Sequence, residues 1–504
     1  MNPPTPENTS SAKQFPEATP KQWPQTDNGN AELFAELYAE NVRFDHKRGR
    51  WLIWDKEQHR WLEDTQDGVR ILAKNAARHR AKCAASIANK DEASKEFRWA
   101  MESENSHRIN STLREAKALS SIADDGEGWD AEPWLFGVAN GVIDLRTGEL
   151  REETQEDRIT KFSPVKFDAK ASCRRFIQFL SEIFDGDSEL IAYVQKMCGY
   201  SLTGSVREQC LFALYGSGAN GKTTFLECIL FIMGEYGTDL PFSALEPQRF
   251  GCSPGEGVDL PGARLAKSVE IREGRHLDEA RIKSWTGGDT ITVRPLYKNQ
   301  FSFRPTHKLW LCFNHRPLIS DDTNAMWRRM RLIPFGQTFG PDKIDKNLPN
   351  VLQAEASGVL NWMLAGCLSW QKEGLEPPTV VQTATTKYAA DSDVLQPFFD
   401  ERCEIGDRFE VPKGELWTAY QQYAAASRER ALDRKVFSER LSNRFGERRT
   451  KTVRYWTGIG LRREAVMPVA VGRPLTIDLT GMAADGEDHH TLRLSLEPGE
   501  DGDG

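Results

Sequence analysis

The sequence predicts an α/β chain with a P-loop nucleotide-binding core, preceded by an α+β region and followed by a C-terminal winged helix. Three observations support this prediction. A glycine-rich loop joins an apolar strand to a helix near residue 216, strands and helices alternate after it, and a basic helix–helix–hairpin order lies close to residue 460. With 504 residues, 39% of them hydrophobic, the chain is long enough for about three domains with substantial cores.

A phosphate-binding loop occupies the middle of the stretch Leu211–Met233, as Gly216-x-x-x-x-Gly221-Lys222-Thr223. Loop N–H groups and the N-terminus of the following helix favour phosphate, and the glycines remove Cβ atoms that would obstruct its approach. Lys222 is expected to reach the β/γ-phosphates, and Thr223 to offer its hydroxyl to Mg²⁺. The pattern therefore predicts nucleoside triphosphate binding, against a chance match in an ordinary strand–turn–helix unit. The predicted binding residues are Gly216, Ser217, Gly218, Ala219, Asn220, Gly221, Lys222, Thr223 and Thr224.

Hydrolysis requires further groups: acids for Mg²⁺ and water, a polar γ-phosphate sensor and an arginine. The strand expected over Arg264–Glu270 ends in an acid, and Glu273 follows as a candidate to polarise water. A second apolar strand over Lys308–Asn314 ends in an amide, which is either a sensor or an ordinary turn former. Because the carboxyl ends of parallel strands converge beside the nucleotide, we expect these two strand ends to lie close together. Arg328 and Arg329 follow, and either is a candidate to reach the phosphate of a neighbouring subunit.

Composition divides the rest of the chain into segments. Residues 1–30 are rich in Pro, Thr, Asn, Gln and Ser and are expected to be disordered. An α+β domain is expected over 31–165, with its first helix starting at Ala31, then the ATPase domain over 166–385, a winged helix over 386–463 and a weakly structured acidic tail over 464–504. Trp51, Trp54 and Trp61 are expected to fill a small β core, although stacking on bases is the alternative.

The charge distribution matters more than the net charge of −8. Residues 264–331 hold 14 Lys/Arg against 7 Asp/Glu, and residues 411–463 hold 13 against 5. Such segments are compatible with phosphate contacts or with solvated helix faces. In the winged helix we expect DNA contacts, with a protein-binding winged helix as the alternative. The candidate DNA-binding residues are Arg434, Lys435, Arg440 and Arg444 on the second helix, and Arg448, Arg449, Lys451 and Arg454 in the wing.

The sequence also bears on the cellular compartment. It has no run of eighteen apolar residues and no signal-like start, and its nine cysteines form no CxxC pair. We therefore expect a cytoplasmic protein in a reducing compartment, with no membrane partner, no zinc site and no disulfide framework.

The run from Ser268 to Phe335 resembles the ATPase core of the viral superfamily 3 (AAA+) helicases, and more narrowly that of the phage, plasmid and poxvirus primase-helicases. The family pattern is a strand ending in an acid, Lys-x-x-Thr-Gly-Gly-Asp, a hairpin, a strand followed by Asn-x-x-Pro, and Trp-Arg-Arg. It falls here on Glu270, Lys283, Thr286–Asp289, Asn314, Pro317 and Trp327–Arg329. One departure is Val269, which separates Ser268 from the acid and leaves the role of Glu273 open.

The resemblance implies a ring, a hexamer by the family's pattern, that hydrolyses ATP with Mg²⁺ and travels 3′ to 5′ on single-stranded DNA. In the family, a hairpin ahead of the sensor strand lines the pore, and Thr290–Val293 and Gln300–Phe303 are its expected arms here. Tyr297 and Lys298 fall at its tip, with Lys298 as the expected phosphate contact and an ordinary turn lysine as the alternative. The other implied roles are Mg²⁺ coordination by Thr223 and Glu270, γ-phosphate sensing by Asn314, and a trans arginine at Arg328 or Arg329.

The setting implied is replication of a phage or mobile element in a bacterial cytoplasm, on single-stranded and forked DNA. Longer family members carry a primase domain ahead of this module. Residues 1–130 show no paired-carboxylate strand pattern, so we expect no primase activity in this chain and a separate primase or other replication proteins as partners. Two other classes remain open. One is an AAA+ initiator or loader that remodels a partner without processive unwinding; the other is a P-loop kinase for a small molecule, which the winged helix and the paired arginines argue against.

Overall fold

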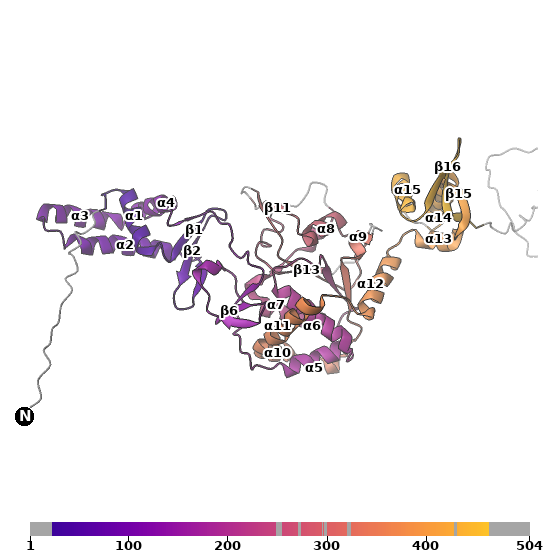
Figure 1. Ribbon diagram of the computed structural model, residues 1–504, viewed down its shortest axis with the longest axis horizontal. Helices are drawn as coiled ribbons and strands as arrows, with labels where there is room; N and C mark the ends of the chain where they lie inside the picture. Colours follow the sequence, from indigo (N-terminus) through magenta and orange to yellow (C-terminus); the bar gives the residue numbers. More distant parts are fainter. Residues whose placement is uncertain are drawn as a thin grey trace, which may run out of the picture. The chain divides into compact units, whose positions relative to one another are not determined.

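The computed structural model describes residues 23–247, 255–270, 274–294, 296, 300–319, 324–427 and 431–462 (Figure 1). The chain divides into two compact units, Met1–Phe398 with Leu432–Arg444 and Phe399–Ala431 with Phe445–Gly504. Within the described ranges, no helix combines the length and the apolar character that a bilayer span requires.

The first unit opens with four helices and a small sheet. Its elements are α1 (Asp27–Tyr38), β1 (Val42–Asp45), β2 (Arg50–Asp55), β3 (Arg60–Glu63), α2 (Gly68–Ala84), α3 (Lys90–Ser103), α4 (Ser106–Ala116) and β4 (Ala123–Asp124). The strand order is β3-β2-β1-β4. The first helix begins at Asp27 and not at Ala31, because the Thr26 hydroxyl accepts a hydrogen bond from the Gly29 N–H at 3.1 Å and caps the helix.

Two of the three tryptophans lie inside this part of the protein, as the core interpretation expects. Trp61 is 2% exposed, and its ring centroid lies 5.5 Å from that of Trp54 and 5.4 Å from that of Trp129. Both pairs meet edge to face, the arrangement that aromatic quadrupoles favour. Trp51 is half-buried and packs against Phe44 at 5.0 Å. Packing within the protein is therefore the main role of these three rings.

A second small sheet follows this part in the chain and precedes the five-stranded sheet. It contains β5 (Leu135–Val138), β6 (Gly141–Asp144) and β7 (Glu149–Arg151), and it is followed by η1 (Gln155–Asp157), α5 (Arg174–Ile183) and α6 (Ser188–Leu202). The turn signals at Asn140-Gly141 and Thr147-Gly148 are confirmed, since they flank β6 as expected. Gly141 adopts a φ of +139°, and a Cβ there would lie 2.4 Å from the Arg151 carbonyl oxygen.

Glu153, just after β7, gives the first testable prediction. It is 6% exposed, its Oε1 has no hydrogen-bond partner among the described residues, and burial raises the pKa of its carboxyl to about 8. Because the folded state then binds more protons than the unfolded state between about pH 4.5 and 8, stability should fall as pH rises through that window. The slope contributed is at most about 1.4 kcal/mol per pH unit. Urea unfolding of the wild type and Glu153→Gln across this range checks it: the variant should lack this slope, and equal slopes would contradict the prediction.

The core of the first unit is a parallel five-stranded sheet. Its strands are β8 (Leu211–Tyr215), β9 (Gly237–Asp239), β10 (Leu265–Glu270), β13 (Lys308–Phe313) and β14 (Met330–Pro334), in the order β14-β8-β13-β10-β9. All neighbouring pairs are parallel. The strands expected at 211–215, 264–270 and 308–314 are all present. The strand that precedes the P-loop therefore lies directly beside the strand that ends just before Asn314.

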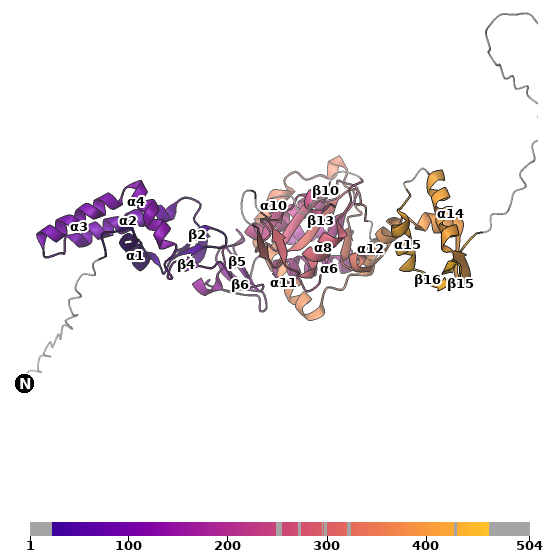
Figure 2. The ribbon, with the colours of Figure 1, turned by 90° about the horizontal axis from the view of Figure 1, so that it is seen from above.

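Helices cover both faces of this sheet (Figures 1 and 2). Alternate residues of β8 and β13 belong to two different hydrophobic clusters, because successive side chains of a strand point to opposite faces. Phe212, Leu214 and Trp310 pack with α5, α6, α7 (Lys222–Met233), α10 (Leu348–Ala354) and α11 (Ala356–Glu373). Leu211, Ala213 and Leu309 pack with α8 (Glu279–Gly287), α9 (Asn324–Trp327) and α12 (Thr379–Asp391). The core is thus α/β, as predicted, and its helices and sheet form three layers.

Two glycines allow α6 and α11 to cross closely behind the P-loop helix. A Cβ on Gly199 of α6 would lie 2.0 Å from the Cys367 nitrogen, and one on Gly366 of α11 would lie 2.1 Å from the Gln195 carbonyl oxygen. Such distances leave no room for any side chain at either position.

The expected hairpin is present between the acid strand and the sensor strand. Its arms are β11 (Ile291–Val293) and β12 (Phe301–Phe303), which pair antiparallel with Ile291 opposite Phe303. The hydroxyls of Thr292 and Ser302 lie 2.8 Å apart across the arms. The tip residues Tyr297 and Lys298 lie outside the described residues.

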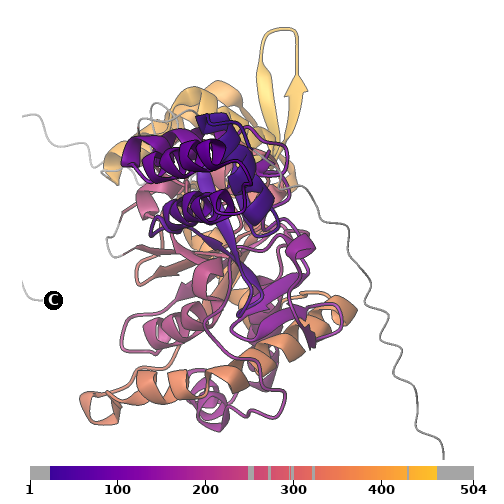
Figure 3. The same cartoon turned by 90° about the vertical axis from the view of Figure 1, so that its left-hand side faces the viewer.

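The second unit contains a three-stranded antiparallel sheet in the order β15-β17-β16, visible as the yellow hairpin and its neighbour in Figure 3. The segments are α13 (Gln396–Arg402), β15 (Cys403–Pro412), α14 (Lys413–Ala426), α15 (Arg434–Ser442), β16 (Gly446–Arg449) and β17 (Arg454–Leu461). This is the strand–helix–helix–hairpin order expected for a winged helix, although α15 groups with the first unit.

Candidate nucleotide site

The P-loop closes around the ammonium group of Lys222, the first residue of α7. Lys222 is 4% exposed, and its Nζ donates to the Gly216 carbonyl oxygen at 2.7 Å, to Asn220 Oδ1 at 3.1 Å and to Asn314 Oδ1 at 3.0 Å. All three acceptors are neutral oxygens. Burial lowers the pKa of the Lys222 ammonium, because no carboxylate among the described residues compensates its charge. A cation held in this way is arranged to receive a phosphate anion.

The contact between Lys222 and Asn314 joins the ends of two adjacent strands. Phe313 pairs with Tyr215, so Asn314 and Gly216 both follow their strands at the same edge of the sheet. The expected convergence of the P-loop and the sensor strand is therefore observed. A γ-phosphate bound by Lys222 would therefore lie next to the side-chain amide of Asn314.

Two glycines of the loop are closely surrounded by protein atoms. A Cβ on Gly216 would lie 2.2 Å from Asn220 Nδ2 and 2.5 Å from the Phe335 carbonyl oxygen. A Cβ on Gly221, whose φ is +83°, would lie 2.6 Å from Ile183 Cγ2. Gly218 alone has open space around its missing side chain, and its requirement is a φ of +102°. Gly216 and Gly221 are thus required by contacts within the protein, and their expected part in keeping the phosphate approach open stays a prediction.

The acid strand β10 occupies the position next to the sensor strand, with Glu270 opposite Phe313. The side chain of Glu270 and the whole of Glu273 lie outside the described residues, so their expected roles remain predictions. Lys267, unusual in such a strand, is paired with Asp239 at 2.8 Å and Glu227 at 3.5 Å. Its charge is therefore compensated within the protein, and its presence does not argue against an acid at the end of the strand.

Arg328 and Arg329 lie at the opposite edge of the sheet from the P-loop. The Leu211 N–H donates to the Arg329 carbonyl oxygen at 2.9 Å, so these arginines adjoin the start of β8, roughly 17 Å of strand from Gly216. Arg329 is 8% exposed, and its Nη1 donates to the Ala325 carbonyl oxygen at 2.7 Å. Arg328 is exposed. Burial thus distinguishes Arg328 from Arg329, which were equivalent candidates in the sequence.

Arg316 is a candidate site residue that sequence reasoning missed. Its Nη1 donates to Asp391 Oδ2 at 2.7 Å, and its guanidinium lies 4.6 Å from the Tyr215 ring and 5.3 Å from the Tyr388 ring. Arg316, which lies two positions after Asn314, therefore connects Tyr215, the residue before the P-loop, to α12. The signal was present in Asn-His-Arg-Pro, where only the first and last residues were given roles.

The basic candidates near the C-terminus separate into two groups. Arg434, Lys435, Arg449 and Lys451 are exposed, which their expected DNA contacts require. Arg440 is 6% exposed, so the expectation that it faces DNA is wrong; it is part of the interior side of α15 beside Phe437 and Leu441. Arg444 pairs with Asp393, and Arg448 donates to both carboxylate oxygens of Glu410 at 2.9 and 2.6 Å.

Two family models match the chain. Residues 31–185 match the family described as D5 N terminal like, and residues 214–329 match a family of unknown function. Similar proteins include one named "Putative helicase" in Acanthamoeba polyphaga mimivirus, which is 26% identical over 409 residues and covers 73% of this chain and 42% of that protein. A protein of the same name in Frog virus 3 is 22% identical over 407 residues, covering 63% and 41%. One named "Putative primase" in African swine fever virus is 24% identical over 212 residues, covering 40% and 22%.

The fold is similar to the apo structure of the NrS-1 C terminal region, with a TM-score of 0.50, 11% identity and coverage of 86% of this chain and 99% of that chain. The chain is thus similar to viral proteins named putative helicases and a putative primase, and its residues 31–185 match the D5 N terminal like family. It spans about two fifths of the length of its first two viral relatives. The first family model runs from within α1 to α5, and the second covers every candidate nucleotide-site residue from Gly216 to Arg329.

Proposed function

We propose that this protein is an ATP-dependent DNA helicase of the AAA+ type that assembles as a ring, most simply a hexamer, and moves on single-stranded DNA during replication of a phage or mobile element. The names of the viral relatives support the coarser assignment to a replication helicase or primase. The observation that carries the finer proposal is the Lys222 ammonium, held by neutral oxygens between Gly216 and Asn314.

The residues at this edge fit a nucleoside triphosphate with Mg²⁺. Lys222 supplies an uncompensated charge for the β/γ-phosphates, and Asn314 aligns the γ-phosphate. The Thr223 side chain is exposed one residue further along α7, where its hydroxyl is free to reach Mg²⁺. The metal would neutralise charge on the phosphates, with Glu270 as the second residue to hold it and Glu273 as a candidate to orient water.

The distance of Arg328 from its own P-loop supports a ring. An arginine at the start of β14 lies at the wrong edge of the sheet for the nucleotide of the same subunit. A neighbouring subunit packed against that edge would bring the exposed Arg328 to a phosphate in trans. In this proposal, hydrolysis moves the β11–β12 hairpin, and Lys298 transfers that motion to a DNA phosphate.

The test is ATP hydrolysis with and without single-stranded DNA. Wild type should be stimulated by DNA, whereas Lys298→Ala should lose the stimulation and keep its basal turnover, because the substitution removes a DNA contact and not a nucleotide contact. Lys343→Ala, which removes an exposed lysine outside the hairpin, is the matched control and should behave as wild type. Hydrolysis that ignores DNA in the wild type would overturn the helicase proposal. Stimulated hydrolysis without strand separation on forked DNA would favour a loader that remodels a partner.

A further inference from the structure

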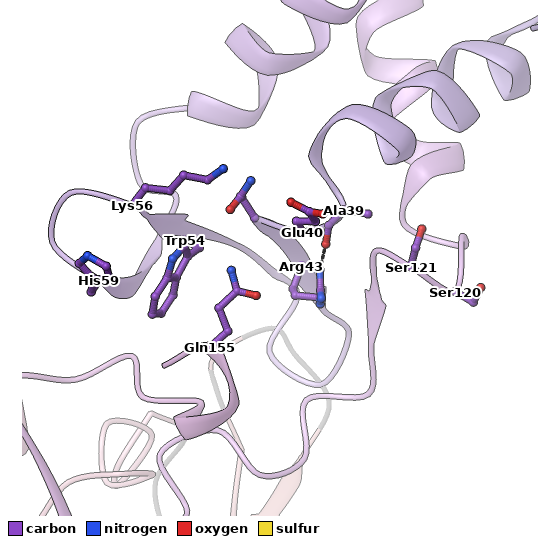
Figure 4. Close-up of a pocket in the computed structure, with 10 residues that line it drawn as sticks. Ala39, Glu40, Arg43, Trp54, Lys56, His59, Ser120, Ser121 and Gln155 are labelled. Carbon is purple, nitrogen blue, oxygen red and sulfur yellow. Dashed lines mark hydrogen bonds between the residues drawn. The ribbon is translucent and has the colours of Figure 1, made fainter. Parts of the chain in front are cut away.

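A cavity of about 720 Å³ lies in the N-terminal part of the first unit, outside the nucleotide site. Four segments distant in sequence form it: the connection from α1 to β1, the end of β2 with its turn to β3, the loop after α4, and η1 (Figure 4). The lining residues are Ala39, Glu40, Asn41, Arg43, Trp54, Lys56, His59, Ser120, Ser121 and Gln155. The volume is sufficient for one nucleotide with its solvent.

The lining is polar and predominantly basic. Arg43, Lys56 and His59 line the cavity together with a single acid, Glu40. In Figure 4, Lys56 and His59 lie on the same side of the cavity as Trp54, and Gln155 lies across from them beside the indole ring. Asp55 fixes the turn that carries the two basic residues, since its Oδ1 accepts the N–H groups of Glu57 at 2.8 Å and Gln58 at 3.0 Å. Lys56 and His59 therefore lie in a turn that hydrogen bonds hold in place, directly after β2.

Arg43 is the fixed cation of the cavity. Its Nη1 donates to the carbonyl oxygens of Ala39 and Val42, the latter at 2.8 Å, so only neutral oxygens hold it. The acid whose charge influences it, Asp124, is itself engaged by Arg158 at 2.8 Å and Trp129 at 3.0 Å. Burial accordingly lowers the pKa of the Arg43 guanidinium. A half-buried guanidinium without a carboxylate of its own favours an anion in the adjoining cavity.

Three polar side chains that line the cavity with Arg43 have unused hydrogen-bonding capacity. Asn41, Gln155 and Ser121 make no side-chain hydrogen bond within the described part of the chain. The amides of Asn41 and Gln155 offer both donors and acceptors, the pattern needed to contact the edge of a base. Cations for phosphate, amides for a base edge and an aromatic wall thus line the same cavity.

We propose that this cavity is a second nucleic-acid site, which holds one nucleotide of single-stranded DNA with its phosphate at Arg43, Lys56 and His59 and its base beside Trp54, Asn41 and Gln155. A free nucleotide shares this chemistry. The choice of a DNA strand rests on the proposed function, because a protein that travels on single strands meets a nucleotide unit of this kind outside its pore. The cavity also has no glycine-rich loop to enclose a triphosphate.

The first test locates the contact. The full chain is irradiated, without ATP, in complex with oligo-dT that carries a single 5-iododeoxyuridine, a base that crosslinks to neighbouring aromatic and electron-rich side chains. Mass spectrometry should place a crosslink within residues 39–61, which contain Trp54 and His59. Crosslinks confined to other segments would overturn the proposal. Addition of excess dTMP separates the two sources of nucleotide: loss of the crosslink at dTMP concentrations that leave overall DNA binding unchanged would assign the cavity to a free nucleotide and overturn the assignment to DNA.

The second test measures affinity with exposed residues, so that folding is preserved. The double variant Lys56→Gln, His59→Asn removes two basic side chains. Asparagine is chosen at position 59 because it tolerates the φ of +50° there. This double variant should bind oligo-dT about fivefold more weakly, and its plot of log K against log salt should be shallower by about 0.7 for each phosphate that the protein no longer neutralises. Lys74→Gln with Lys95→Gln removes two exposed charges from α2 and α3 and is the matched control. Equal reductions in affinity in both double variants would show a diffuse charge effect and overturn the proposal.

The crosslinking and affinity tests do not depend on the proposed ATPase activity. Both double variants should hydrolyse ATP at the basal rate of the wild type, because no altered residue lies near the P-loop. If the wild type fails to hydrolyse ATP but still crosslinks through residues 39–61, the proposed function fails and the cavity assignment survives. If hydrolysis is DNA-stimulated and the Lys56→Gln, His59→Asn variant binds as the wild type does, the cavity assignment fails alone.

Discussion

Replacing Lys222 by methionine is expected to lower ATP turnover by about 10²–10³-fold. The substitution keeps the length of the buried side chain and removes the one charge that Gly216, Asn220 and Asn314 hold in place. Three neutral acceptors lose a donor, at a cost of about 1–3 kcal/mol, which the removal of an uncompensated buried charge partly offsets. The fold should therefore persist while phosphate binding fails. Phosphate release and the binding of a fluorescent ATP analogue measure the two effects separately.

Lys267→Met is the control for that experiment. Lys267 lies in β10 of the central sheet and, like Lys222, is largely buried, with a side chain 14% exposed, but it pairs with Asp239 and Glu227 and not with the P-loop. Its loss should cost no more than about 1 kcal/mol in stability and leave turnover close to wild type. If Lys222→Met retains near-normal turnover, the ammonium is a structural group and the P-loop assignment fails.

Arg328→Ala is expected to reduce turnover by about 10³-fold without weakening ATP binding, because its proposed contact is to the charge that develops in the transition state. The exposed side chain predicts an unchanged stability for this variant. Arg329→Ala should show the reverse pattern. Its guanidinium is buried and bonded to the Ala325 carbonyl oxygen, so its removal should destabilise the protein before it affects chemistry.

A mixing experiment tests whether Arg328 acts across a subunit boundary. Lys222→Met subunits retain the arginine and Arg328→Ala subunits retain the P-loop. In a mixed assembly, an intact P-loop receives an intact arginine from its neighbour, and turnover should recover in part although both parent proteins are inactive. Co-purification through two different tags establishes that mixed assemblies form. No recovery in verified mixed assemblies would show that the arginine acts within its own chain or not at all.

The elements that the sequence predicted well are those whose signals are local. The strand Leu211–Tyr215 and the start of α7 at Lys222 coincide with the predicted bounds, because an apolar run, a glycine loop and a helical period follow one another without interruption. The start of α1 was wrong by four residues, since the Thr26 cap lies inside a stretch whose composition favours disorder.

The features that were missed depend on residues far apart in the chain. Arg440 is basic and sits on a basic helix, and only the packing of α15 shows that its side chain is buried. Arg316 meets Asp391, 75 positions away, and no spacing rule relates them. Arg328 and Arg329 are alike in sequence and differ only in which of them the start of β14 turns inward. Burial and long-range pairing thus distinguish residues that composition treats as equal.

The close crossing of α6 and α11 restricts which substitutions the protein can tolerate. With a backbone atom 2.0–2.1 Å from where each Cβ would stand, even alanine at position 199 or 366 must push the helices apart. Both helices belong to the same hydrophobic cluster as Phe225 and Ile229 of α7, so a wider separation would loosen the layer that supports the P-loop helix. Substitution at these two glycines should therefore be tolerated less well than at many residues of the nucleotide site itself, and genetic screens that score folding and turnover separately would detect them as folding defects.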